Sequence, residues 1–587
     1  MTLSIGQRVL RHLPFSGSTT ALQALTYLVG ISLFSISFLV FLNSSVSFVI
    51  TDLIGVKDGV GDIVGTLGFV DEIVALIACP IWGLVSDRAG VRYVAVVGYL
   101  VIGLALFLFV QARNVYPQLL LARIFFAVGA TAAATMVTAI LPSLTDETGS
   151  AVEAIRKPST AGAQSVALSV DSEATITPER FQGGPSDAPN ENGAGQKTGK
   201  PSALAGYVGL FTGCGALVAL SLFLPLPARF GKIEGITMGQ AVQYSFYVVG
   251  VVSFLVAIFV FFGLRNIRGE EGKGWKLLLG LKGSTTRGAG SEALPAPRNK
   301  VLPYWHLLKD SVYLGLRDSD IALGYLGGFV ARASTVAISL FIPLFVNEYF
   351  IGHGYCKGSP HDPSPELKKE CRQAYVLASI LTGVAQLMGL ICAPLFGHLS
   401  SRVGRVNWPI VVATTFGIIG YVSFAQLSSP EYKDVNGRGG SPAVFLLAAL
   451  IGISQIGAIV CSLGSLGRGV LKADIVNVLT LPDGDQETLI ESPDGAGETA
   501  PLLENEAVIP EDTVSRVRLK GSVAGVYSWC GGAAILLLTK LGGYLFDVWS
   551  TGAPFYLMAV FNGVLLLASI AIDSGKAARR RQSARLR

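Results

Sequence analysis

Three ionisable side chains lie inside stretches of the sequence that are otherwise apolar. Asp71 and Glu72 lie near the middle of the stretch 60–85, and Arg332 lies near the middle of the stretch 321–345. A charged group inside a membrane span is costly, so its presence there indicates a function. Successive helix residues point about 100° apart, so Asp71 and Glu72 cannot both face one cavity squarely.

These charges predict proton or anion chemistry inside the membrane. We expect one of the two acids to be a protonatable coupling site, and Arg332 to bind an anionic group or to hold the acid. The alternative is a structural buried ion pair that fixes helix packing. Asn43 and Gln455 are further polar candidates inside apolar stretches, for which the alternative is an interhelical hydrogen bond.

The composition requires that such side chains be positioned by membrane-spanning helices. Charged residues make up 14% of the 587 residues and apolar residues 51%, with a mean hydropathy of +0.55. A soluble domain carries about 25% charged residues, and a spanning helix needs about 20 apolar ones. Twelve stretches qualify: 25–50, 60–85, 93–110, 116–141, 203–226, 242–264, 321–345, 374–399, 408–427, 443–466, 523–546 and 553–572. The sequence therefore predicts an all-α, polytopic protein of the lipid bilayer.

Three long polar segments, 142–200, 265–320 and 471–520, interrupt the apolar pattern. They are rich in Gly, Ser, Pro and acidic residues, and we expect them to be largely disordered loops. The middle one separates a six-helix lobe at 25–264 from a second at 321–573. Lys and Arg gather in 1–24, in the middle loop and in the tail 574–587. Such residues favour the cytoplasmic side, so both termini are expected there.

The two halves share a sequence motif. After the second stretch the chain reads Gly83-Leu-Val-Ser-Asp87-Arg88-Ala-Gly90-Val-Arg92, and after the eighth it repeats Gly397, Arg402 and Gly404 at the same spacing. The first copy resembles the signature of the major facilitator superfamily, G-x-L-a-D-r-x-G-r-r. The resemblance implies two six-helix bundles related by a pseudo-two-fold axis, which work by alternating access and need no cofactor. Val91 replaces a basic residue of that pattern, and Ser401 replaces the acid in the second copy.

The resemblance also implies roles for two side chains. Asp87 is expected to pair with Arg88, with Arg92 or with the N-terminal end of a helix in the other lobe, and so to close the cytoplasmic side. The alternative is an ordinary charged turn. Arg123 lies in a stretch similar to the family's R-x-x-x-G-x-G pattern, with Ala127 at the first glycine. In proton-coupled members that arginine helps to couple protons, and the alternative here is an arginine that extends to the membrane surface.

Other motifs concern the loops. Cys356 and Cys371 share one polar loop and are the only disulfide candidates, because the other five cysteines lie in apolar stretches. Two acidic-dileucine patterns lie in the third polar segment, Asp485 with Leu489 and Ile490, and Glu498 with Leu502 and Leu503. They resemble signals that bind cytoplasmic sorting adaptors, which favours a vacuolar or lysosomal membrane, with the plasma membrane second. The long insertions indicate a eukaryotic protein, and we expect a fungal one.

Several classes of function are excluded or disfavoured. The basic residues do not form one patch, so nucleic-acid binding is not expected. The sequence lacks a nucleotide-binding P-loop, a C-x-x-C pair and a His/Cys metal cluster, so neither a pump, an enzyme nor a metal site is expected. Arg265-Asn-Ile-Arg268 stands where sugar porters carry P-E-S-P-R, which disfavours sugars. We expect a monomeric secondary transporter of a small solute coupled to protons, with a transporter-like nutrient sensor as the alternative.

Overall fold

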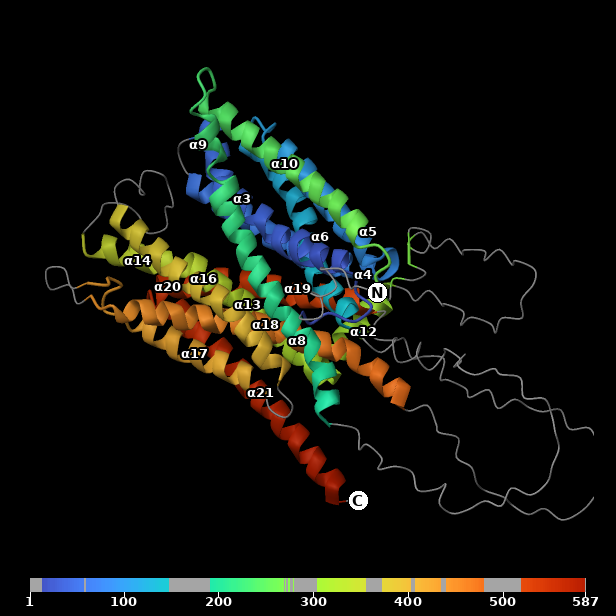
Figure 1. Cartoon of the computed structure of the whole chain (residues 1–587). Coiled ribbons are helices and arrows are strands. Elements are labelled where there is room, and N and C mark those ends of the chain that lie inside the picture. Colours follow the sequence, from blue (N-terminus) through green and yellow to red (C-terminus); the bar gives the residue numbers. More distant parts are fainter. Residues whose placement is uncertain are drawn as a thin grey trace, which may run out of the picture.

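The computed structural model describes residues 13–56, 60–146, 191–268, 270, 273–274, 278, 304–354, 372–402, 407–433, 440–479 and 519–585, and all regular structure in these ranges is helical. Twelve helical runs are long and apolar enough to cross a membrane. The predicted all-α, twelve-span architecture is therefore confirmed. The helices form two lobes, drawn blue to green and yellow to red in Figure 1.

The N-terminal lobe contains the first six spans. Its elements are α2 (Ala21–Leu25), η1 (Thr26–Leu33), α3 (Phe34–Phe48), η2 (Val49–Ile54), α4 (Val60–Ala89), α5 (Val91–Phe109), η3 (Val115–Leu119), α6 (Leu120–Thr145), α8 (Glu191–Val218), η5 (Ala219–Phe223), α9 (Leu226–Phe230) and α10 (Met238–Gly263), where η marks π-helical turns that continue a span. Inside a bilayer every backbone amide needs an internal partner, so apolar stretches of this length form helices.

The C-terminal lobe follows α12 (Tyr304–Arg317), a helix between the lobes. Its elements are α13 (Ser319–Val336), η6 (Ala337–Phe341), α14 (Ile342–Gly352), α16 (Arg372–Ser401), α17 (Trp408–Ala425), α18 (Ala443–Leu479), α19 (Lys520–Leu537), η8 (Leu538–Gly542), α20 (Gly543–Val548) and α21 (Ala553–Arg585).

Several helices extend beyond the predicted spans. α8 begins inside the polar segment 142–200, α18 continues into 471–520, α12 lies within 265–320, and α21 includes most of the tail. The expectation of disorder in the three polar segments was therefore wrong for the parts that α8, α12 and α18 cover. The prediction ended each helix where the apolar composition ends, but backbone hydrogen bonds hold a helix equally well through polar residues in water. Hydropathy marks the lipid boundary, not the end of the helix.

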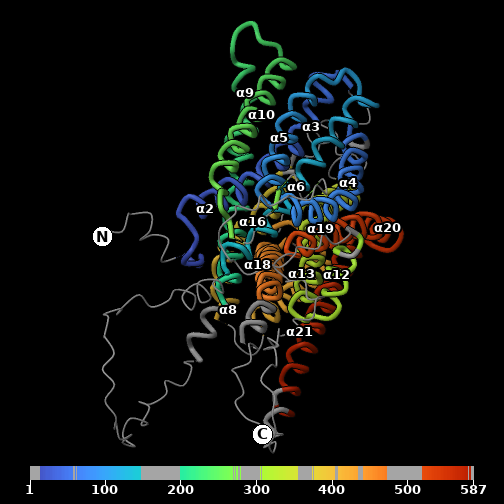
Figure 2. The backbone as a smooth tube through the Cα atoms, turned by 90° about the vertical axis from the view of Figure 1, so that its right-hand side faces the viewer, coloured from blue at the N-terminus to red at the C-terminus, as the bar shows by residue number. Residues whose placement is uncertain are grey.

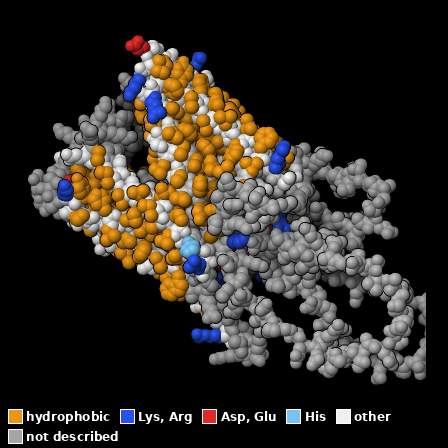
Figure 3. Space-filling view, viewed as in Figure 1, with side chains coloured by type: hydrophobic (Ala, Val, Ile, Leu, Met, Phe, Trp, Pro, Cys, Tyr) orange, Lys and Arg blue, Asp and Glu red, His pale blue; other side chains and the backbone are white. Residues whose placement is uncertain are grey.

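Matching aromatic clusters fill the cores of the two lobes. In the first lobe the Phe246 ring lies 4.9 Å from Phe41 and 5.7 Å from Phe109. In the second, the rings of Phe424 and Phe345 lie 4.9 and 5.8 Å from Phe555. Each cluster joins the first, third and sixth spans of its lobe, as pseudo-two-fold symmetry requires. Outside these cores, hydrophobic side chains cover the face of both lobes shown in Figure 3, which suits contact with lipid.

The lobes touch at one end, where glycines let two helix pairs approach closely. On α4 and α19, a Cβ added at Gly83 would lie 2.5 Å from the Gly521 carbonyl oxygen and 2.9 Å from the Gly525 Cα. On α8 and α16, a Cβ added at Gly397 would lie 2.6 Å from the Gly206 Cα. We call this end the closed end. The lobes diverge toward the opposite end, where α9 and α14 lie in Figure 1, and Figure 2 shows the same two lobes from the side.

Candidate functional site

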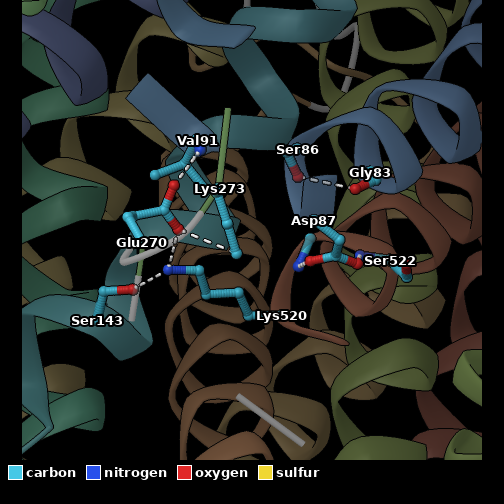
Figure 4. A network of polar contacts seen from close by, with 10 residues as sticks. Gly83, Ser86, Asp87, Val91, Ser143, Glu270, Lys273, Lys520 and Ser522 are labelled. Carbon is cyan, nitrogen blue, oxygen red and sulfur yellow. Dashed lines mark hydrogen bonds and ion pairs between the residues drawn. The ribbon is translucent and has the colours of Figure 1, made fainter. Parts of the chain in front are cut away.

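Asp87 connects the two lobes at the closed end (Figure 4). Its carboxylate accepts hydrogen bonds from the backbone amides of Gly521, at 2.8 Å, and Ser522, at 2.7 Å, and from the Ser522 hydroxyl. These amides belong to the first turn of α19, where the helix dipole favours a negative charge. Of the three partners that the sequence allowed for Asp87, the structure selects the helix N-terminus of the other lobe.

The rest of the first motif shapes the turn that carries Asp87. Gly90 has φ +99°, a conformation that favours glycine, and it links α4 to α5 in one residue. The Arg88 carbonyl accepts a hydrogen bond of 3.0 Å from the Gly274 amide of the inter-lobe segment. The Arg92 guanidinium lies over the Phe261 ring, 4.4 Å from its centroid. The Arg88 backbone thus ties the turn to the inter-lobe segment, and the Arg92 side chain ties it to α10.

A second contact between the lobes joins Glu270 to Lys520 (Figure 4). The Lys520 Nζ lies 2.6 Å from a Glu270 carboxylate oxygen and 2.6 Å from the Ser143 hydroxyl, and its side chain is 0% exposed. Glu270 also accepts from the Val91 amide at 2.7 Å and from the Lys273 ammonium at 3.1 Å. Burial alone raises the pKa of Glu270, but the charges of Lys520 and Lys273 outweigh it and hold that pKa below its usual value.

The second lobe repeats part of this arrangement, with its carboxylate bonded inside its own lobe. Asp573, near the end of the last span, accepts hydrogen bonds of 2.9 Å from both the backbone amide and the side-chain amide of Asn407, the residue before α17. This is the same cap that Glu270 gives to α5. Gly397 makes the glycine contact described above, while Arg402 is exposed. Gly404 lies outside the described residues.

In the middle of the first lobe, Arg123 pairs with Asp71. The Arg123 Nε lies 2.9 Å from each Asp71 carboxylate oxygen, and one terminal nitrogen bonds both to that carboxylate and to the Asn43 side-chain oxygen. The Arg123 side chain is 4% exposed and that of Asp71 16%. Arg123 therefore does not extend to the membrane surface, and the structure unites three predicted residues from three spans.

Glu72 of the first lobe and Arg332 of the second lie within electrostatic range of each other. Both interact electrostatically, yet neither has a hydrogen bond or an ion pair within the part of the chain that the structure describes. Arg332 is exposed although it lies near the middle of the span Ser319–Gly352, and its stem packs beside Gly531, where an added Cβ would lie 2.8 Å from the Arg332 Cγ. Glu72 is fifteen residues from Asp87 on α4, which places this pair about 22 Å from the closed-end contact.

Gln455 lies beside this region. Its side-chain amide donates a hydrogen bond of 2.9 Å to the Thr335 hydroxyl, which links α18 to α13 one turn beyond Arg332. This contact is the interhelical bond that the sequence allowed as an alternative. The predicted disulfide of Cys356 and Cys371 lies outside the described residues, as do both sorting patterns with Asp485, Leu489, Ile490, Glu498, Leu502 and Leu503.

Sequence reasoning missed Glu270, Lys520 and Ser522. Each lies at the edge of a polar segment, where a charged residue is ordinary and carries no pattern of its own. One signal existed for Ser522, because the repeat of Ala205-Gly206 in Ala524-Gly525 marks the start of the span that faces Asp87. Groups of three or more His, Cys, Asp or Glu residues that could hold a metal are absent from the described ranges.

Comparison with known proteins agrees with this geometry. The family model described as "Major Facilitator Superfamily" matches residues 33–153 and 198–473, more than half of the chain. The fold is similar to that of the proton:xylose symporter XylE, at 13% identity and a TM-score of 0.50 over 93% of this chain and 94% of that one. It is also similar to FucP in its outward conformation, at 11% identity and a TM-score of 0.50 over 93% and 97%. No curated protein matches the sequence. The signature at Asp87, the repeated lobes and the family match together show that this chain belongs to the major facilitator superfamily.

Proposed function

We propose that the protein is a secondary active transporter that moves a small solute by alternating access and couples the movement to protons. The observation that carries this proposal is the set of four charged side chains, Asp71, Glu72, Arg123 and Arg332, which both lobes contribute inside their spans. Charges inside a span are costly and are functional candidates by default. The family supports transport, because its members share this two-lobed architecture.

The two acids take different parts in this proposal. Asp71 is held by two geometrically fixed bonds from Arg123, so its carboxylate has a permanent counter-charge. Glu72 has only the diffuse attraction of the two arginines and no bonded partner among the described residues. We therefore assign proton exchange to Glu72 and assign to Asp71 and Arg123 the fixing of α4 against α6.

The test is flux across a sealed membrane. Purified full-length protein is reconstituted into proteoliposomes with a trapped pH-sensitive dye, and a panel of solutes is added from outside. We expect at least one solute to move protons with it, and Glu72→Gln to abolish this proton movement while solute binding persists. A protein that binds a solute in detergent but supports neither solute nor proton flux would be a sensor, and the proposal would be wrong.

We further propose that the closed end faces the cytoplasm of a vacuolar or lysosomal membrane, and that the protein acts as a monomer. The Lys and Arg residues of 1–24, of the inter-lobe segment and of the tail support this orientation, because such residues favour the cytoplasmic side. Replacing Leu502 and Leu503 together with Leu489 and Ile490 by alanine tests the sorting signal. An unchanged location of the tagged protein would contradict adaptor binding.

A further inference from the structure

The charges of Glu72 and Arg332 indicate the chemical class of the transported solute. Resting on the proposed transport function, we propose that the cargo is a small organic anion, such as a carboxylate, which binds Arg332 while Glu72 holds the proton that travels with it. The argument begins from a cation that has no bonded counter-charge. Arg332 lies at mid-span, exposed, and without a hydrogen bond or ion pair in the described part of the chain.

Glu72 is a counter-charge for Arg332 that has no bonded partner among the described residues. The side chains that interact electrostatically with Arg332 include Glu72 and Cys79 of α4 and Tyr527 of α19. A cysteine thiol and a tyrosine hydroxyl are uncharged near neutral pH. Asp71 and Arg123, the other charges near Glu72, neutralise each other through direct bonds.

The backbone is shaped to keep Arg332 accessible. Gly531 and Gly532 of α19 lie beside α13 and α4. A Cβ added at Gly531 would lie 2.8 Å from the Arg332 Cγ, and one added at Gly532 would lie 3.7 Å from the Leu76 Cδ2. A side chain at Gly531 would therefore occupy the space of the Arg332 stem, and glycine leaves that stem free to present its guanidinium, from which a planar carboxylate can receive two parallel N–H donors.

Charge balance then joins the proton to the anion. In the empty protein the Glu72 carboxylate neutralises Arg332. In the loaded protein Glu72 is protonated, and the anion takes its place as the counter-charge. One proton and one anion bind together, so the empty and the loaded protein carry the same net charge. The empty and the loaded protein therefore carry no different charge across the membrane when the cavity changes the side to which it opens. The transport is electroneutral.

Matched pairs of a carboxylate and its own amide test the cargo class. Lactate with lactamide, benzoate with benzamide and nicotinate with nicotinamide differ within each pair chiefly in charge. Thermal unfolding of the purified full-length protein is followed with each compound at several pH values. We expect at least one carboxylate to stabilise the protein, its amide to bind at least tenfold more weakly, and Arg332→Ala to lose the carboxylate effect. Lys540→Gln, which removes an exposed cation of η8, is the matched control and should bind as the wild type does.

Glu72→Gln tests directly whether Glu72 carries the proton. Because this substitution is nearly isosteric, it still provides a test if Arg332→Ala does not fold and accumulate. Wild-type affinity for the carboxylate should fall by up to tenfold per pH unit as Glu72 ionises, whereas the affinity of Glu72→Gln should stay constant. Equal binding of amides and carboxylates, or a wild-type pH profile in Glu72→Gln, would overturn the inference.

The outcomes separate this inference from the proposed function. If a neutral solute moves with protons while carboxylates have no effect, the protein is a proton-coupled transporter and the anion class is wrong. If carboxylates bind through Arg332 but no flux occurs, the anion site stands and transport is wrong. In proteoliposomes whose membrane potential is set with potassium and valinomycin, carboxylate flux should not depend on that potential. A strong dependence would refute the one-to-one balance.

Discussion

The ion pair between Glu270 and Lys520 gives a sharp prediction about the closed end. Glu270→Gln keeps the size of the side chain and an oxygen that can accept from the Val91 amide at 2.7 Å, so the cap of α5 persists. What the substitution removes is the negative charge. Lys520 then retains only the Ser143 hydroxyl, and the Lys273 ammonium loses its bonded anion as well.

The expected effect follows from burial. The Lys520 side chain is 0% exposed and that of Glu270 14%, so the pair is largely shielded from water. Removing one partner of a buried ion pair costs about 3–5 kcal/mol, because the remaining charge stays desolvated. Separation of the lobes would return Lys520 to water, so the cost falls on the closed conformation alone. At about 1.36 kcal/mol per tenfold change, the ratio of closed to open protein should fall by about 150- to 5,000-fold.

Distances between spin labels measure this ratio. Labels at Phe262 and Leu399, both exposed and one in each lobe, report whether the closed end separates. Asp573→Asn is the matched control, because Asp573 caps α17 as Glu270 caps α5 but contacts no residue of the other lobe among its described bonds. Glu270→Gln should produce a long-distance population that Asp573→Asn lacks. The reasoning would be refuted if the ratio of closed to open protein changed by less than threefold in Glu270→Gln, or if it changed equally in both variants.

Three further predictions concern the same elements. Gly83→Ala should prevent closure, because the added Cβ would meet the backbone of α19. Gly65→Ala on the same helix is the control, because its Cβ meets nothing within 4 Å and should raise helix stability by about 1 kcal/mol. The accessibility of a thiol introduced at the closed end should rise in the first variant and not in the second. Asp71→Asn should lower the free energy of unfolding by about 3–5 kcal/mol, because Arg123 stays buried without its counter-charge, which denaturation in detergent measures. Acid should open the closed end, because the pKa of Glu270 is lowered in the closed conformation. The stabilisation by its charge is complete above about pH 4.3 and is lost as the pH falls below that value. The label distances of the wild type should therefore lengthen in acid, and those of Glu270→Gln should not.

The two contacts at the closed end differ in kind. Both pairs of helices cross at glycines, Gly83 with Gly525 and Gly397 with Gly206, as the repeat requires. The charges differ between the crossings: Ser401 stands where Asp87 would repeat and Pro201 stands where Lys520 would, while Arg468 of α18 donates to the Ser202 hydroxyl of α8 at the second crossing. We infer that close packing fixes the geometry of closure at both crossings, and that the carboxylate contacts at the first set how readily the end opens.

The sequence by itself determined the twelve spans, the two lobes and the turn at Asp87. These features depend on local composition and on a motif of ten residues, and the bilayer leaves an apolar stretch of 20 residues little choice but a helix. The mid-span positions of Asp71, Glu72 and Arg332 followed from the same apolar pattern.

Only the tertiary structure decided which of these residues meet. Asp71 and Glu72 are neighbours in the chain, yet the rotation of α4 turns one toward Arg123 in its own lobe and leaves the other within electrostatic range of Arg332. Glu270 and Lys520 are 250 positions apart in polar segments without a pattern, and packing alone brings them to 2.6 Å. Pairings of this kind depend on how helices rotate and cross, which hydrophobic periodicity constrains weakly when nearly every face is apolar.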